Sequence, residues 1–355
     1  MIVLNRKVSV TGRYMENPFQ LEFHSLIEKA DKIRQSKWGK KVFFVRNLHL
    51  NYTNICVSHC KFCAFAKNKN EDGSYNMTPD DAVKYVSQQG KDAGEIHIVG
   101  GLHPDYPFEY YVDMVHALKI NFPEKTIKAF SAVEIDYFSR ISGKSVAEVL
   151  EALKKAGVEM MPGGGAEIFA DHVRRQICPE KIPASRWLEI HETAHNTGLT
   201  TNATMLYGHL ENDEDKFQHL LLLRDLQEKS LSRGLTGFSA FIPLSFQPDD
   251  TFLHGKFHAT GIEDIKTTAC ARIVLENIPH IKAYWVMLGH KTAQIALRAG
   301  ADDLDGTIVK ENIAYAAGKN TDEAMTAEQL VFIVKSAGMV AVERDSFYRE
   351  VKIYG

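Results

Sequence analysis

Three cysteines within eight residues are the part of the sequence with the clearest capacity for chemistry. Cys56, Cys60 and Cys63 have the spacing C-x3-C-x2-C, and Phe62 directly precedes the last of them. Three thiolates at this spacing can hold a [4Fe–4S] cluster and leave one iron free, as a catalytic centre requires. The alternative is a zinc site with His59 or a distant cysteine as fourth ligand. Structural zinc sites usually use two C-x2-C pairs, and the chain has no second pair, so the pattern favours iron and sulfur.

The remaining composition is typical of an ordinary soluble protein. The 355 residues are 45% hydrophobic and 25% charged, with a formal net charge of −3. Disulfides are not expected, because the five cysteines are odd in number and three of them crowd one segment; Cys178 and Cys270 are interpreted as small structural residues. No apolar stretch approaches the roughly 18 residues of a membrane span, and no secretion signal is present at Met1. We therefore expect a cytoplasmic protein that binds neither nucleic acid nor membrane.

Apolar, β-branched segments alternate with amphipathic segments along most of the chain. Each pair takes roughly 30 to 40 residues, which is typical of a buried parallel sheet with crossover helices. The expected strands cover residues 42–45, 95–99, 126–130, 158–161, 200–207, 237–242 and 283–288. Capping residues and glycine stops predict helices over 79–89, 146–156 and 186–196. The pattern predicts an α/β fold, a (β/α) TIM-type barrel, full or partial, with six or more parallel strands.

Three regions are expected along the chain. Residues 1–40 are predicted to form an N-terminal helical extension, 41–290 the barrel, and 291–355 a C-terminal cap packed on it. The cysteines follow the first barrel strand, so they would lie on the first βα loop. Active sites of such barrels are built at that end.

The cysteine motif resembles that of the radical S-adenosylmethionine superfamily, C-x3-C-x-aromatic-C, with Phe62 at the aromatic position. The resemblance implies a [4Fe–4S] cluster on the three cysteines and S-adenosylmethionine as co-substrate. It further implies that Gly100 and Gly101 hold the methionine moiety, although a tight βα turn explains this pair as well. Glu167 is expected to accept hydrogen bonds from the ribose, unless it is an exposed helix-start carboxylate. Met205 belongs to the element that would contact adenine, and core packing is the alternative there.

Longer strings narrow the resemblance to the enzymes of the futalosine route to menaquinone and a related deazaflavin-forming synthase. They cover residues 51–54, 100–104, 128–135, 162–169, 203–209 and 277–285. Segments 174–179, 300–307 and 342–345 look most like the aminofutalosine synthase family. That family adds a 5′-deoxyadenosyl radical to 3-[(1-carboxyvinyl)oxy]benzoate, with rearrangement and loss of the carboxyl group, and gives 6-amino-6-deoxyfutalosine. An electron donor such as flavodoxin or ferredoxin is implied as partner.

The implied small-molecule substrate carries two carboxylates, which an apolar barrel must pair with cations or hydrogen-bond donors. The candidates at expected strand ends or in the closing segment are His103, His209, Lys282 and Arg344. A structural role remains the alternative for each. His97 lies within an expected strand, and the sequence does not decide which side it faces.

Two other functions remain open from the sequence. The first is dehypoxanthine futalosine cyclase of the same pathway, which would abstract a hydrogen atom and close a ring. The second is a zinc-stabilised protein without enzymatic activity.

Overall fold

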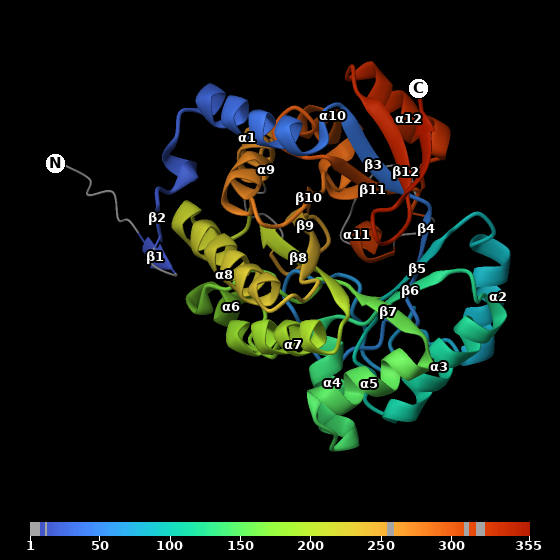
Figure 1. Ribbon diagram of the computed structural model, residues 1–355. Helices are drawn as coiled ribbons and strands as arrows, with labels where there is room; N and C mark the ends of the chain where they lie inside the picture. Colours follow the sequence, from blue (N-terminus) through green and yellow to red (C-terminus); the bar gives the residue numbers. More distant parts are fainter. Residues whose placement is uncertain (1–7, 11–12, 254–258, 309–311, 317–323) are drawn as a thin grey trace.

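The fold is organised by a seven-stranded parallel sheet that curls around its own axis (Figure 1). The computed structural model describes residues 8–10, 13–253, 259–308, 312–316 and 324–355. The strand order is β10-β9-β8-β7-β6-β5-β4. These strands are β4 (Asn47–Leu50), β5 (Glu95–Ile98), β6 (Thr126–Ala129), β7 (Val158–Met161), β8 (Thr200–Tyr207), β9 (Phe238–Ser245) and β10 (His280–Ile281).

A second sheet lies between the two ends of the first. Its order is β11-β3-β12-β13, with β11 (Asp303–Gly306), β3 (Lys41–Val45), β12 (Val340–Arg344) and β13 (Glu350–Tyr354). β3 runs into β4 through Arg46, and β11 pairs in parallel with β3. A parallel bridge between Lys282 and Asp303 joins the end of β10 to β11. The predicted (β/α) barrel architecture is therefore confirmed.

Helices follow the strands and cover the outside of the curled sheet (Figure 1). The crossover helices are α2 (Pro79–Gln89), α3 (Phe108–Asn121), α4 (Ala132–Ser142), α5 (Val146–Ala156), α6 (Asp171–Ile177), α7 (Ala184–Asn196), α8 (Asp213–Ser232) and α9 (Gly261–Val274). α5 shows why the sequence forms them: Ser145 and Glu148 make a capping box, and Gly157 ends the helix at φ 126°. The predicted helices 79–89 and 146–156 are confirmed, and 186–196 lies within α7.

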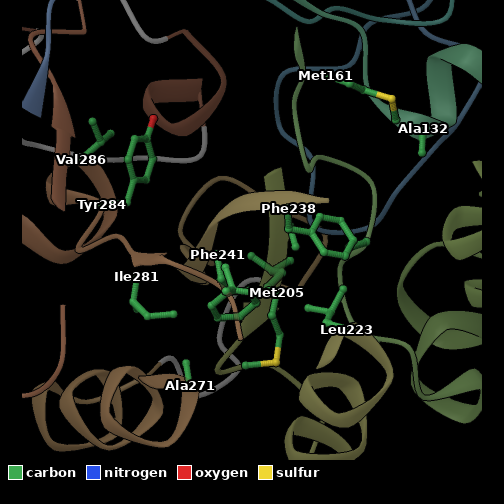
Figure 2. Packing of buried hydrophobic residues seen from close by; sticks show 14 of the residues in the cluster. Ala132, Met161, Met205, Leu223, Phe238, Phe241, Ala271, Ile281, Tyr284 and Val286 are labelled. Atoms are coloured by element: carbon green, nitrogen blue, oxygen red, sulfur yellow. The ribbon is translucent and has the colours of Figure 1, made fainter. Parts of the chain in front are cut away.

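The buried layer between strands and helices is apolar. Figure 2 shows Met205 of β8, Phe241 of β9 and Ile281 of β10 in this layer together with Ala271 of α9. All four side chains are excluded from solvent. Burial of apolar surface stabilises the fold here by roughly 25 cal/mol per Å².

One predicted strand is wrong. Residues 283–288 were expected to be a strand, but α10 (Trp285–Ala296) begins there and the strand is the two-residue β10 just before it. A short, wholly apolar run fits a buried helix as well as a buried strand, because it carries no periodicity. The ends of the remaining predicted strands lie within three residues of the observed strand ends.

The terminal segments add further helices and strands to those of the barrel. The N-terminal part contains β1 (Val8–Val10), β2 (Arg13–Met15), η1 (Pro18–Gln20) and α1 (Phe23–Trp38), and the C-terminal part also contains α11 (Asn312–Ala316) and α12 (Ala327–Ser336). α1 packs against α9. Parts of the three expected regions (1–7, 11–12, 254–258, 309–311 and 317–323) lie outside the described residues, and the division at 40 and 290 stays a prediction. None of the described helices is long and apolar enough to cross a membrane.

Candidate active site

A cavity of about 320 Å³ reaches from the loop after β4 into the interior of the barrel. Its outer part is lined by the three cysteines of this loop, together with the glycine-rich turns that follow β5 and β7. Its inner part is lined by charged and imidazole side chains from the strands. Leu206, Ile242, Leu244, Phe246 and Met287 form an apolar wall. The mixture of apolar wall and few polar groups is typical of a small-molecule site.

The cysteine loop is held in place by backbone hydrogen bonds to three neighbouring segments. The amide of Cys56 donates to Lys67 O at 3.1 Å, that of Val57 to Leu102 O at 3.1 Å, and that of Lys61 to Ile177 O at 2.8 Å. These hydrogen bonds give partners to backbone amides that would be paired within a helix or sheet if the segment had regular secondary structure. The loop is therefore fixed although it contains no helix.

The thiols of Cys56, Cys60 and Cys63 all line the cavity, and none forms a disulfide. Over the described residues, no three His, Cys, Asp or Glu side chains are grouped closely enough to hold a single metal ion. The donor set nevertheless fits an iron–sulfur cluster, which needs three separated soft thiolates rather than one convergent site. Burial raises the pKa of the Cys60 thiol to about 12 and raises that of Cys63, and the ammonium of Lys181 opposes both shifts.

The Gly100–Gly101 turn lies directly against the cysteine loop. A Cβ on Gly101 would stand 2.2 Å from Ile55 O and 3.1 Å from the Cys56 Cβ, so only glycine fits. Glu134 Oε1 accepts hydrogen bonds from the Gly100 amide at 3.1 Å and from the hydroxyl of a buried tyrosine, Tyr52, at 2.8 Å. Both glycines line the cavity. The turn therefore brings exposed backbone to the same space as the thiols.

A second group faces the thiols from the other side of the cavity mouth. Glu167 follows the triple glycine after β7, and its φ of 48° lies in the left-handed region. The Lys181 ammonium lies 2.5 Å from Glu167 Oε1 and 5.0 Å from the centre of the Phe62 ring. Burial alone would lower the pKa of Lys181, but neighbouring Cys60 and Glu167 raise it. Strained backbone at a polar residue that lines a cavity is a common feature of functional sites.

The inner part of the cavity holds Lys282 and His97, which the sequence analysis named, together with three residues that it did not single out: His49, Lys128 and Asp305. His49, His97 and Lys128 stand opposite one another on β4, β5 and β6, and the two imidazole rings lie 4.7 Å apart. Lys282 and Asp305 form an ion pair that also lines the cavity. The sequence offers one signal for residues that face the barrel interior, a polar side chain at an alternate position of a buried strand. Of the strand residues, only His97 was considered on this ground.

Lys128 forms an ion pair with Glu95, which does not line the cavity. Its Nζ lies 2.8 Å from Glu95 Oε1, and both side chains are almost fully buried. Burial would raise the pKa of Glu95, but Lys128 and Lys282 together lower it to about 2. Burial lowers the pKa of His49 to about 4, so this imidazole is neutral near pH 7.

Four of the predicted site residues do not line the cavity. The ring of His103 stacks on Tyr106 at 4.0 Å, and that of His209 is paired with Glu211 at 3.0 Å. Arg344 is held by Asp303, 2.7 Å from its Nε. Met205 points into the outer apolar layer (Figure 2) because Thr204 and Leu206, its neighbours along β8, face the cavity. Functional roles for His103, His209, Arg344 and Met205 stay predictions that this geometry does not favour.

Comparison with known proteins agrees with the arrangement of the site. Residues 50–223 match the family model of the radical SAM superfamily, and residues 235–353 match the CofH/MqnC C-terminal region. Over 93% of this chain and 89% of the relative, the sequence is 45% identical to aminodeoxyfutalosine synthase of Thermus thermophilus. The chain belongs to the radical SAM superfamily. Members of this superfamily use a [4Fe–4S] cluster and S-adenosylmethionine. Because the family model and the synthase relative both match, the chain is an enzyme of this kind, and the alternative of a zinc-stabilised protein without activity is removed.

Other relatives of this radical SAM enzyme carry two different names. Aminodeoxyfutalosine synthase of Streptomyces coelicolor is 40% identical over 92% of this chain and 86% of the relative. A 5-amino-6-(D-ribitylamino)uracil–L-tyrosine 4-hydroxyphenyl transferase of Methanopyrus kandleri is 37% identical over 94% and 91%. Among solved structures, methylornithine synthase superposes with a TM-score of 0.70 at 16% identity, covering 91% of each chain. At that identity the likeness supports the fold alone.

Proposed function

We propose that this radical SAM enzyme is an aminodeoxyfutalosine synthase of menaquinone biosynthesis. The observation that supports this most is the 45% identity to the Thermus thermophilus synthase over nearly the whole of both chains. Transferase relatives, including that of Methanopyrus kandleri, are 35–38% identical. The proposed substrates are S-adenosylmethionine and 3-[(1-carboxyvinyl)oxy]benzoate, and the products are 6-amino-6-deoxyfutalosine, methionine and the lost carboxyl group as carbon dioxide or bicarbonate.

The cysteine loop and its neighbours would hold the co-substrate. Cys56, Cys60 and Cys63 are the proposed cluster ligands, and the cluster, when bound, supplies the electron that cleaves the sulfonium of S-adenosylmethionine. Gly100 and Gly101 would let the methionine moiety approach the backbone closely. Glu167 lines the same space, and its carboxylate is the proposed acceptor for the ribose hydroxyls.

The chain's own contribution to the reaction is then binding, orientation and exclusion of water. Addition of a carbon radical to an alkene requires the two carbons about 3–3.5 Å apart, so positioning carries much of the catalysis. The apolar wall of the cavity, which includes Leu206, Ile242 and Phe246, would keep water from the reactive centre.

Two candidate functions compete with this proposal. The cyclase of the same pathway is the alternative that the sequence leaves open, and the transferase relatives favour transfer of a 4-hydroxyphenyl group from tyrosine. The test is anaerobic incubation of the reconstituted, reduced enzyme and S-adenosylmethionine with each of the three substrate sets, followed by mass analysis. We expect a product that carries both the adenosyl group and the benzoate. Free 5′-deoxyadenosine formed with turnover of dehypoxanthine futalosine or of tyrosine would contradict the proposal.

A further inference from the structure

Two buried lysines from distant strands meet at the inner end of the cavity. Lys128 belongs to β6, and Lys282 directly follows β10, with three strands between them in the sheet order. Each side chain is only 3–4% exposed, yet both line the cavity. Because the sheet curls, residues far apart in strand order face each other across its interior.

The position of Lys128 is fixed by the strand register. His49 is paired with His97, and His97 with Lys128, in consecutive parallel ladders. Residues in register on neighbouring strands project from the same face of a sheet, and all three line the cavity. They therefore form one continuous polar wall opposite Lys282.

The charges that face the cavity do not cancel. Lys128, Lys282 and Asp305 line it, whereas Glu95, the ion-pair partner of Lys128, does not. Both ammonium groups but only one of the two carboxylates therefore reach the cavity at this end, although the four groups together carry no net charge. An ammonium has three N–H donors, and the hydrogen bond to Asp305 uses one of those of Lys282.

Stability alone gives little reason for this arrangement. Removing an ammonium from water costs several kcal/mol, and replacing a buried ion pair by apolar residues of similar volume is often neutral or stabilising. A cationic lining with spare donors is, however, well suited to a carboxylate, since charge-assisted hydrogen bonds are the strong ones.

We propose that Lys128 and Lys282 bind one carboxylate of the substrate, and that Glu95 and Asp305 are positioning residues that hold the two ammonium groups. The inference rests on the proposed function for the identity of the substrate and names the residues that hold it. With the carboxylate bound at the inner end, the rest of the substrate extends towards the cysteine loop.

The test is the affinity of the anaerobically reconstituted protein, with S-adenosylmethionine and without reductant, for small acids. 3-Methoxybenzoate carries the benzoate carboxylate of the substrate, and 2-phenoxyacrylate carries the enol-ether carboxylate. Their methyl esters are neutral controls of nearly the same shape. Titration calorimetry of Lys128→Met and Lys282→Met is expected to show a roughly 10- to 100-fold weaker Kd for one of the two acids. The affinity for the corresponding ester is expected to stay unchanged.

Further variants separate binding from folding. Lys128→Met leaves a buried carboxylate unpaired, so Glu95→Gln/Lys128→Met removes both charges, and Lys282→Met/Asp305→Asn does the same for the second pair. Lys216→Met is the matched control, because Lys216 is equally buried and paired with Glu263 but lies outside the cavity lining. It should bind both acids as the wild type does.

The possible outcomes distinguish the two proposals. Unchanged acid affinity in both double variants overturns the lysine assignment and leaves the proposed function intact. Failure of wild-type protein to bind either acid overturns the assignment as well. Weakened acid binding together with a product that lacks the adenosyl group supports the lysine assignment and contradicts the proposed function.

Discussion

The two ends of the cavity are built in different ways. At the outer end, the three thiols come from one loop of eight residues, and the Gly100–Gly101 turn packs directly against it. At the inner end, the polar and charged residues come from strands spread over more than 250 residues of chain, from His49 to Asp305. The outer end depends on local spacing and the inner end on strand register.

Because the two ends are built differently, substitutions at each end should affect function and stability to different extents. The cysteine loop is held mainly by backbone hydrogen bonds, so its thiols can be changed without leaving a buried charge unpaired. The inner residues are joined in ion pairs, so a change in one affects its partner. Variants of the thiols should therefore lose function and keep their stability, whereas variants at the inner end should lose function and part of their stability.

The largest effect is expected at the outer end. Cys60→Ala should reduce bound iron after reconstitution, and product formation, to background, because two thiolates cannot hold the cluster. Iron content, visible absorption and product analysis measure this. Cys270→Ala is the control, since Cys270 is buried in α9 away from the cavity. Wild-type iron content and activity in Cys60→Ala would show that the cluster is not bound by this loop.

The next largest effect is on stability at the inner end. Lys128→Met should lower the free energy of unfolding by about 3–5 kcal/mol, because Glu95 is left as an uncompensated buried charge. The double variant Glu95→Gln/Lys128→Met should recover most of this loss. Urea unfolding of the three proteins measures both steps. Equal stability of the wild type and Lys128→Met would show that the ion pair is not buried as described.

The same pair predicts a dependence of stability on pH. Burial would raise the pKa of Glu95, but Lys128, Lys282 and further cations together lower it to about 2 in the folded chain against an ordinary value of 4.5. A lowered carboxylate pKa contributes stability that is complete above about pH 4.5 and is lost as the pH falls towards 2. Against the wild type, Glu95→Gln/Lys128→Met should lose less stability over that range in urea unfolding at several pH values. Parallel pH profiles would contradict the assignment.

A smaller effect is expected at the glycine turn. Gly101→Ala should lower the free energy of unfolding by about 1–3 kcal/mol, because the new Cβ overlaps Ile55 O and displaces the cysteine loop. Iron uptake should fall with it. Gly261→Ala, which meets no atom within 4 Å, is the control for thermal unfolding and iron content. If both variants behave alike, the close approach of turn and loop is unimportant.

The smallest effect concerns Met205. Met205→Leu conserves volume in the outer apolar layer and should cost less than about 1.5 kcal/mol. The KM for S-adenosylmethionine should stay unchanged, since Leu206 and not Met205 faces the cavity. A raised KM with unchanged stability would restore the cofactor-binding role that the sequence suggested.

The sequence singled out most residues that line the outer end of the cavity and few that line the inner end, for a physical reason. Cysteine spacing, the glycine pair and Glu167 are local patterns, and the structure brings all of them to one cavity. Lys128 faces that cavity only because its strand pairs in register with His97, which local spacing does not reveal. β10 was missed because two residues form no pattern, although Lys282 beside it was a candidate.

The most direct test is the structure of crystals grown without oxygen, with S-adenosylmethionine and 3-[(1-carboxyvinyl)oxy]benzoate but no reductant. We predict anomalous scattering from iron bound by the sulfurs of Cys56, Cys60 and Cys63. We also predict a substrate carboxylate within hydrogen-bonding distance of Lys128 or Lys282. Iron capped by a fourth protein side chain, or a substrate whose carboxylates lie away from both lysines, would contradict it.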